Sequence, residues 1–222
     1  MKKINTKKLT VMGVICALAF ICVLLFRFEV GGFLTFDIKD AVLTIASLIY
    51  GPLAGLICSF TVTFLEFVLI SDTGVYGFIM NFLSSAALSC IAGLIYKYRR
   101  TMLGAVIGIV FAVFGVTAVM LLANLFITPL FLNMERSAVV GMILPLLLPF
   151  NIIKAVFNSA LVLLIYKPFT VTLKKAKLLD VEGSAGYKLN FKSVLLMVIS
   201  LIVLIGALLF LFLNMGGTID LF

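Results

Sequence analysis

The chain has 222 residues, of which 64% are hydrophobic, and its mean hydropathy is +1.32. Soluble domains are only about 45–50% apolar, so a water-soluble globular protein is excluded, and a lipid bilayer must take up the excess apolar surface. The net charge is +8, but the positive residues gather at the ends of apolar segments, which indicates membrane orientation and no nucleic acid partner, since nucleic-acid binding needs a solvated basic face.

The first apolar segment predicts a helix over about Leu9–Phe28, long enough to span a bilayer. Its basic start resembles a signal peptide, but no small-residue cleavage site follows, so we expect a retained first helix. A polar outer loop, Glu29–Asp40, comes next. The apolar stretch Ala41–Tyr50 is too short to cross alone, and Gly51-Pro52 ends it because proline lacks the N–H that a continuing helix needs.

The remaining apolar segments predict four further helices of the bundle, joined by short polar turns. Between the last two, the mixed stretch 130–148 carries two prolines and is expected to be irregular, with a short helix over the outer mouth. We predict these helices at Leu53–Ile70, Val75–Tyr96, Met102–Ile127 (ended by Thr128-Pro129) and Pro149–Tyr166.

The chain is expected to divide into three parts. Residues 1–179 form a six-helix membrane domain that binds substrate, 180–191 form a cytoplasmic linker, and 192–222 form an additional transmembrane helix and an outer tail. The added helix, predicted over Val194–Leu213, is uniformly apolar and offers no polar group for a site.

The basic residues are distributed unequally between the two sides of the membrane. If six helices are drawn from an inside N-terminus, thirteen of the seventeen Lys and Arg fall on one side, within 2–8, 97–100 and 167–192. Cytoplasmic loops carry such an excess. We therefore predict a multi-pass protein of the cell (plasma) membrane with a cytoplasmic N-terminus, in which the polar residues of the apolar segments collect in the outer half.

Lys154 is the most unusual residue within the predicted membrane helices. A cation in hydrocarbon costs on the order of 3 kcal/mol, and Asn151, Lys154 and Asn158 share one helix face at spacing i, i+3, i+7. Two interpretations remain open. The stripe can bind a ligand with carbonyl and imide groups, or Lys154 can form an internal ion pair with Glu66 while the asparagines bridge helices. The two can coexist without ligand.

Further polar residues are predicted in the outer half, and no matching set stands in the inner half. A channel needs polar groups along its full depth, so a channel or proton-coupled carrier is disfavoured. The chain has no histidine, no base–nucleophile pair, no metal cluster and no phosphate loop, so we predict no enzyme, no metal site and no cofactor. The outer-half polar residues are Thr35, Asp37, Asp40, Asn81 and Asn124.

Small residues form a stripe on the first helix, where Gly13 and Ala17 stand four positions apart. Such stripes let helix backbones approach closely in lipid. The stripe indicates either packing within this bundle or a docking face for another membrane subunit.

The chain resembles the substrate-binding (S) components of the energy-coupling factor (ECF) vitamin transporters, specifically those of the riboflavin type. The resemblance covers about Leu9 to Lys177, and its most specific segment is Leu148–Lys154, followed by Asn158 and Tyr166-Lys167. The other matching segments are Leu34–Asp40, Tyr50–Gly55, Gly77–Leu83 and Thr128–Phe131.

This resemblance implies a six-helix bundle whose pocket opens outside, is capped by the loop between helices 1 and 2, and binds riboflavin as the transported ligand. It implies docking through Gly13 and Ala17 on a transmembrane coupling subunit that works with two ATPase subunits. The chain has no G-x-x-x-x-G-K-[ST] motif for ATP hydrolysis of its own. The ligand contacts implied by position are Thr35, Asp37, Asn81, Asn124, Asn151, Lys154 and Asn158.

Two features depart from the family pattern. Glu66 stands where a basic residue is expected, and the seventh helix is additional. An S component for another vitamin, such as pantothenate or thiamin, is an alternative, and so is a membrane scaffold without a transport role whose polar stripe is purely structural.

Overall fold

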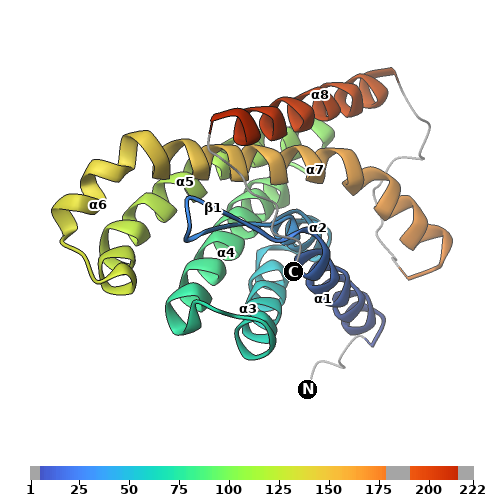
Figure 1. Cartoon of the computed structure of the whole chain (residues 1–222). Coiled ribbons are helices and arrows are strands. Elements are labelled where there is room, and N and C mark those ends of the chain that lie inside the picture. The colour runs from blue at the N-terminus through green and yellow to red at the C-terminus, as the bar shows by residue number, and fades with distance from the viewer. Residues whose placement is uncertain (1–5, 179–190, 215–222) are drawn as a thin grey trace.

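The computed structural model describes residues 6–178 and 191–214, and these form a bundle of helices with one small hairpin (Figure 1). Five helical segments are long and apolar enough to cross a membrane. The predicted all-α membrane fold with a short second helix is confirmed. The helices are α1 (Thr6–Phe26), α2 (Lys39–Tyr50), α3 (Pro52–Leu69), α4 (Gly74–Tyr98), α5 (Met102–Leu132), α6 (Arg136–Met142), α7 (Leu148–Lys175) and α8 (Phe191–Asn214).

The short helix α2 lies in the interior of the bundle, where it packs against α1, α3, α4 and α7. It ends as predicted at Gly51, whose φ of 93° belongs to the left-handed region that favours glycine. Pro52 then starts α3 at a position that needs no intrahelical N–H. Because protein surrounds α2 on several sides, a helix of half the membrane thickness is tolerated there.

The predicted polar loop after the first helix contains a β-hairpin, which is a correction. Helix α1 ends at Phe26, and strands β1 (Phe28–Val30) and β2 (Leu34–Phe36) pair antiparallel across Gly31 and Gly32, both with positive φ. The apolar side chains of the two strands pack into a cluster with Phe150 and Phe157 of α7. This burial, together with the glycine turn, stabilises a hairpin in a segment whose charged ends suggested a loop.

Two predicted helix boundaries near prolines are wrong. Helix α5 continues past Thr128-Pro129 to Leu132, because a proline one turn before the end removes a single intrahelical bond, and Asn133 then closes the helix in a left-handed conformation. The mixed stretch 130–148 is more regular than expected, since α6 leads through one π-helical turn, Ile143–Leu147, directly into α7. Helix α7 extends beyond Tyr166 to Lys175.

Helix α8 lies along α7, as Figure 1 shows, and places Leu204 in the cluster that holds the hairpin. It overlaps the predicted additional helix, Val194–Leu213, but begins at Phe191 and ends at Asn214. The predicted linker, apart from Phe191, lies outside the described residues, as do the outer tail beyond Asn214 and the basic residues Lys2, Lys3 and Lys188.

Candidate ligand-binding site

A cavity lies between the hairpin, α4, α5 and α7, at one end of the bundle. The open space between these elements is about 640 Å³ when the solvent at its mouth is included. It is formed by the tip of the hairpin, the start of α4, the end of α5 and the start of α7. The lining residues are Phe33, Leu34, Thr35, Thr73, Tyr76, Gly77, Met80, Asn81, Ser84, Met120, Asn124, Ile127, Thr128, Phe131, Phe150, Asn151 and Lys154.

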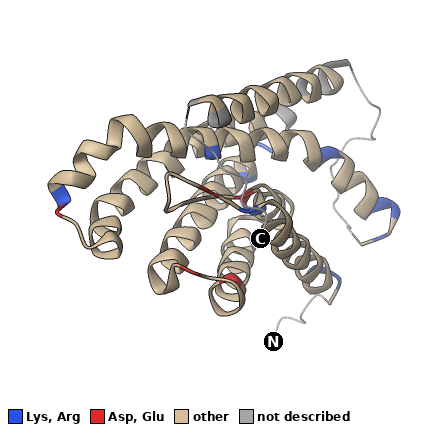
Figure 2. Ribbon diagram, in the orientation of Figure 1, with Lys and Arg blue, Asp and Glu red and all other residues tan. Residues whose placement is uncertain are grey.

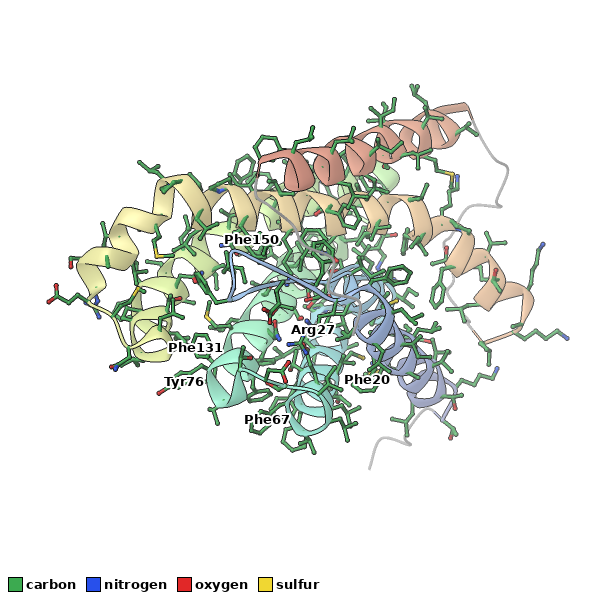
Figure 3. All side chains as sticks on the ribbon, viewed as in Figure 1. Phe20, Arg27, Phe67, Tyr76, Phe131 and Phe150 are labelled. Atoms are coloured by element: carbon green, nitrogen blue, oxygen red, sulfur yellow. The ribbon has the colours of Figure 1, made fainter. Side chains whose placement is uncertain are left out.

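Aromatic and thioether side chains supply the apolar walls of the cavity. Tyr76 of α4 and Phe131 of α5 lie with ring centroids 6.1 Å apart, and Figure 3 shows these two labelled side chains close together, with Phe150 on the far side towards α7. Met80 and Met120 complete the walls. Flat aromatic and adaptable methionine surfaces suit a planar apolar ligand.

Five of the seven predicted contact residues line this cavity, and two do not. Asp37 and Asn158 are fully buried behind it, so the structure places them in the support of the cavity. Those on the cavity wall are Thr35, Asn81, Asn124, Asn151 and Lys154.

A chain of alternating charges runs behind the cavity from α3 to α7. Lys39 Nζ lies 3.3 Å from Glu66 Oε2 and 2.7 Å from Asp37 Oδ2, and Lys154 Nζ lies 2.8 Å from the same Asp37 oxygen. Two carboxylates and two ammonium groups balance one another, which makes their burial tolerable. Figure 2 shows acidic and basic positions on the ribbon where the hairpin meets α2, and a basic position on α7.

The ion pair between Glu66 and Lys154, which the sequence left open as an alternative, is therefore not formed. Glu66 pairs with Lys39, and Lys154 pairs with Asp37 and donates to the carbonyl oxygen of Thr35 at 2.9 Å. Lys39 stands between the two predicted partners because α2 starts at this residue, two positions earlier than the sequence suggested.

Asp37 and Asn158 also satisfy the backbone at the buried start of α2. Asp37 Oδ1 accepts from the Lys39 N–H at 3.1 Å, and Asn158 Oδ1 accepts from the Ala41 N–H at 2.9 Å. The first N–H groups of a helix have no intrahelical partner, and here water is excluded. Asn158 Nδ2 further donates to the Asp37 carbonyl at 3.0 Å, so α7 fixes the junction between hairpin and α2.

Asp37 lies outside the spanning helices, and its ionisation keeps this junction together. Burial alone would raise the pKa of its carboxyl, but the ammonium groups of Lys154 and Lys39 outweigh burial and hold the pKa well below its usual range. Because its pKa is lowered, Asp37 contributes its full stability above the ordinary aspartate pKa, and this contribution declines as pH falls from that value to the lowered pKa. The ion pairs therefore persist at acid pH values that protonate ordinary carboxylates.

The three asparagines on the cavity wall have defined amide orientations. Asn124 Nδ2 and Asn151 Nδ2 each donate at 2.7 Å to a backbone carbonyl one turn earlier, and Asn81 Nδ2 donates to Glu66 Oε1 at 2.9 Å. Thr128 donates to Asn124 Oδ1 at 2.8 Å. These bonds determine which N–H donor or oxygen lone pair of each amide remains available to a ligand.

Several residues of the site escaped the sequence-based prediction. Lys39 was placed in a polar outer loop, where a lysine is ordinarily solvated, yet its side chain is fully buried. The aromatic wall residues gave no signal, because a chain with 21 phenylalanines offers no pattern to separate wall from lipid-facing positions.

The chain is similar to known proteins in sequence and in fold. A family model described as "ECF transporter, substrate-specific component" matches residues 7–166. The riboflavin transporter RibU of Staphylococcus aureus (strain TCH60) is 28% identical over 186 residues, which are 78% of this chain and 97% of that protein. A solved S component of a bacterial ECF transporter is similar with a TM-score of 0.67 and 28% identity, over 77% of this chain and 99% of its own.

Proposed function

The chain belongs to the family of substrate-specific components of ECF transporters, whose model matches well over half of it, and on this premise we propose that its cavity binds riboflavin for import. The protein is the substrate-binding membrane subunit of such a transporter. The observation that carries the riboflavin assignment is the joint placement of the asparagines and Lys154 on one side of a cavity whose other walls are aromatic. The similarity to a protein named as a riboflavin transporter supports it.

The chemistry of riboflavin matches the cavity. Its isoalloxazine ring is flat and largely apolar, which suits the space between Tyr76, Phe131 and Phe150. Its dione edge offers two carbonyl oxygens and an imide N–H. Lys154 can donate to a carbonyl with an N–H not used by Thr35 or Asp37, since an ammonium group has three. The ribityl hydroxyls can use the remaining polar wall.

Titration of the purified protein with riboflavin tests this proposal. We expect quenching of flavin fluorescence on binding, and Lys154→Met should weaken the affinity by about 10- to 150-fold because it removes a charged donor to a buried carbonyl. The exposed Lys175 on the same helix supplies the matched control, and Lys175→Met should leave affinity unchanged. Absence of quenching by the unmodified protein, with stabilisation by pantothenate or thiamin instead, would assign another vitamin.

We further propose that the cavity opens to the outside and that the N-terminus is cytoplasmic. The cavity is lined by the start of α4 and the end of α5, whereas the basic residues stand at the opposite helix ends, at the start of α1 and the ends of α4 and α7. The positive-inside rule then assigns the cavity to the outer side.

Labelling with a membrane-impermeant maleimide tests this orientation. In a variant without the four native cysteines, a cysteine replacing Asp72, which is exposed in the α3–α4 turn, should react in intact cells. A cysteine replacing Lys175 should react only after permeabilisation. The reverse pattern would place the cavity inside and refute capture of a vitamin from the exterior.

Membership of the family also implies an energising ECF module. We propose that it consists of a transmembrane coupling subunit and two ATPase subunits, and that α1 docks on the coupling subunit. Gly13 and Ala17 are both exposed on α1, and among the described residues no other helix comes within 4 Å of a Cβ built at Gly13. Within the part of the chain that the structure describes, both residues are thus open to a partner.

A further inference from the structure

We propose that Glu66 and Lys39, which lie outside the cavity, fix the direction in which Asn81 presents its amide to the ligand, and thereby select a ligand with a hydrogen-bond donor at that point. Glu66 and Lys39 are thus positioning residues. The inference rests on the proposed function for the identity of the ligand, and on the contacts behind the cavity for the mechanism.

The contacts form one continuous path between two residues of the cavity wall. Asn81 donates to Glu66, Glu66 faces Lys39, Lys39 faces Asp37, and Asp37 accepts from Lys154. Asn81 and Lys154 line the cavity, whereas the three charged residues between them do not. Glu66 is 2% exposed and Lys39 is 0% exposed. An acidic residue that merely faced solvent would not take part in such a series of contacts between two residues of the cavity wall.

The carboxylate of Glu66 determines which end of the Asn81 amide faces it. An ionised carboxylate only accepts hydrogen bonds, so the Nδ2 group must face Glu66 and the Oδ1 atom must face away. Without a charged neighbour, an asparagine amide can turn by 180° and exchange donor and acceptor. Lys39 Nζ lies 3.3 Å from the Glu66 carboxylate and balances its charge, which offsets the cost of burying that carboxylate.

The fixed amide makes the wall selective. Asn81 Oδ1 accepts an N–H or O–H from the ligand, whereas a ligand acceptor at the same point would face an acceptor and lose affinity. In riboflavin the available donors are the imide N–H and the ribityl hydroxyls. Either group can donate a hydrogen bond to Asn81 Oδ1. An analogue methylated at the imide nitrogen distinguishes the two, because it lacks the imide N–H and keeps the hydroxyls.

A double-mutant cycle tests the proposal. Riboflavin affinity is measured by fluorescence quenching for the unmodified protein, Glu66→Gln, Asn81→Ala and the double variant. Glutamine keeps the size of Glu66 but can face either end of the amide, so we expect Glu66→Gln to weaken binding about 5- to 30-fold when Asn81 is present. In the Asn81→Ala background the same change should alter affinity less than about twofold. The exposed Glu135→Gln serves as control.

Equal losses in both backgrounds, or no loss in either, would overturn the inference. If Glu66→Gln does not fold, Lys39→Met/Glu66→Gln replaces it in the cycle, because this pair removes both charges together while Asp37 keeps Lys154. The imide-methylated analogue identifies the donor group. If the unmodified protein binds riboflavin more tightly than the analogue and Glu66→Gln does not, the imide N–H donates to Asn81. If Glu66→Gln weakens the binding of both ligands by the same factor, the donor is a ribityl hydroxyl. If the unmodified protein binds no flavin, the proposed function fails, and the cycle is decided with whichever vitamin stabilises the protein.

Discussion

Asp37→Asn is expected to lower the free energy of unfolding by about 3–5 kcal/mol, because it leaves two buried ammonium groups without their shared carboxylate. Asp37 Oδ2 lies 2.7 Å from Lys39 Nζ and 2.8 Å from Lys154 Nζ, and the side chains of Asp37 and Lys39 are fully buried. An asparagine still accepts from the Lys39 N–H but offers no charge. For a chain of this size the loss corresponds to a fall in the unfolding midpoint of about 6–20 °C, measured in detergent without ligand.

Asp72 provides the matched control for this substitution. It also pairs with a cation, Arg27 at 3.6 Å, but its side chain is 83% exposed. Exposed pairs contribute about 0–1 kcal/mol, so Asp72→Asn should shift the midpoint little. Adding Lys154→Met to Asp37→Asn should recover part of the loss, because it removes one unpaired ammonium. A similar shift for both aspartates, or no recovery, would show that the buried charges do not hold the hairpin junction.

The features that the sequence predicted well are those with a local physical cause. Gly51-Pro52 fixes the end of α2 by backbone sterics alone, and the spacing of Asn151, Lys154 and Asn158 fixes their common face by helix geometry. A lysine in an apolar helix requires a partner whatever the fold. These signals were sufficient to predict a bundle with a polar stripe and a cavity beside it.

The features that the sequence did not predict depend on contacts between distant segments. Asp37 is 117 positions from Lys154, and nothing local distinguishes this aspartate from Glu66 as the partner of that ammonium. Lys39 follows the hairpin at the start of α2, and it is buried between elements distant in sequence, where it faces Glu66 of α3. The continuation of α5 past Pro129 is a local feature that proline sterics alone did not predict, since the helix ends only at Asn133 in a left-handed conformation.

One charged residue contributes both to the fold and to the cavity. Lys154 closes the hairpin through Thr35 and Asp37 and also faces the cavity. A ligand that accepts a hydrogen bond from this ammonium therefore uses a group that also holds the hairpin beside the cavity. Because an ammonium has three N–H donors, Lys154 can donate to a ligand while it keeps its bonds to Thr35 and Asp37.

Replacing the small residues of α1 is expected to abolish transport while leaving ligand binding intact. Gly13→Leu/Ala17→Leu places two large side chains on the exposed face that we propose as the docking surface. Close approach of two helices in lipid depends on small side chains, so the variant should lose co-purification with the coupling subunit. Riboflavin uptake by cells should fall more than about tenfold, which requires a loss of at least 1.4 kcal/mol in docking.

The open surroundings of Gly13 make this a test of docking and not of folding. A Cβ at Gly13 meets no other helix of the described residues within 4 Å, so the variant should fold and its affinity for riboflavin should remain within about twofold of the unmodified protein. Gly206 on α8 has equally open surroundings, and Gly206→Leu is the matched control, expected to leave uptake unchanged. Normal uptake by the α1 variant would show that the docking surface lies on another face, because a helix contact through Gly13 and Ala17 has no room for two leucines.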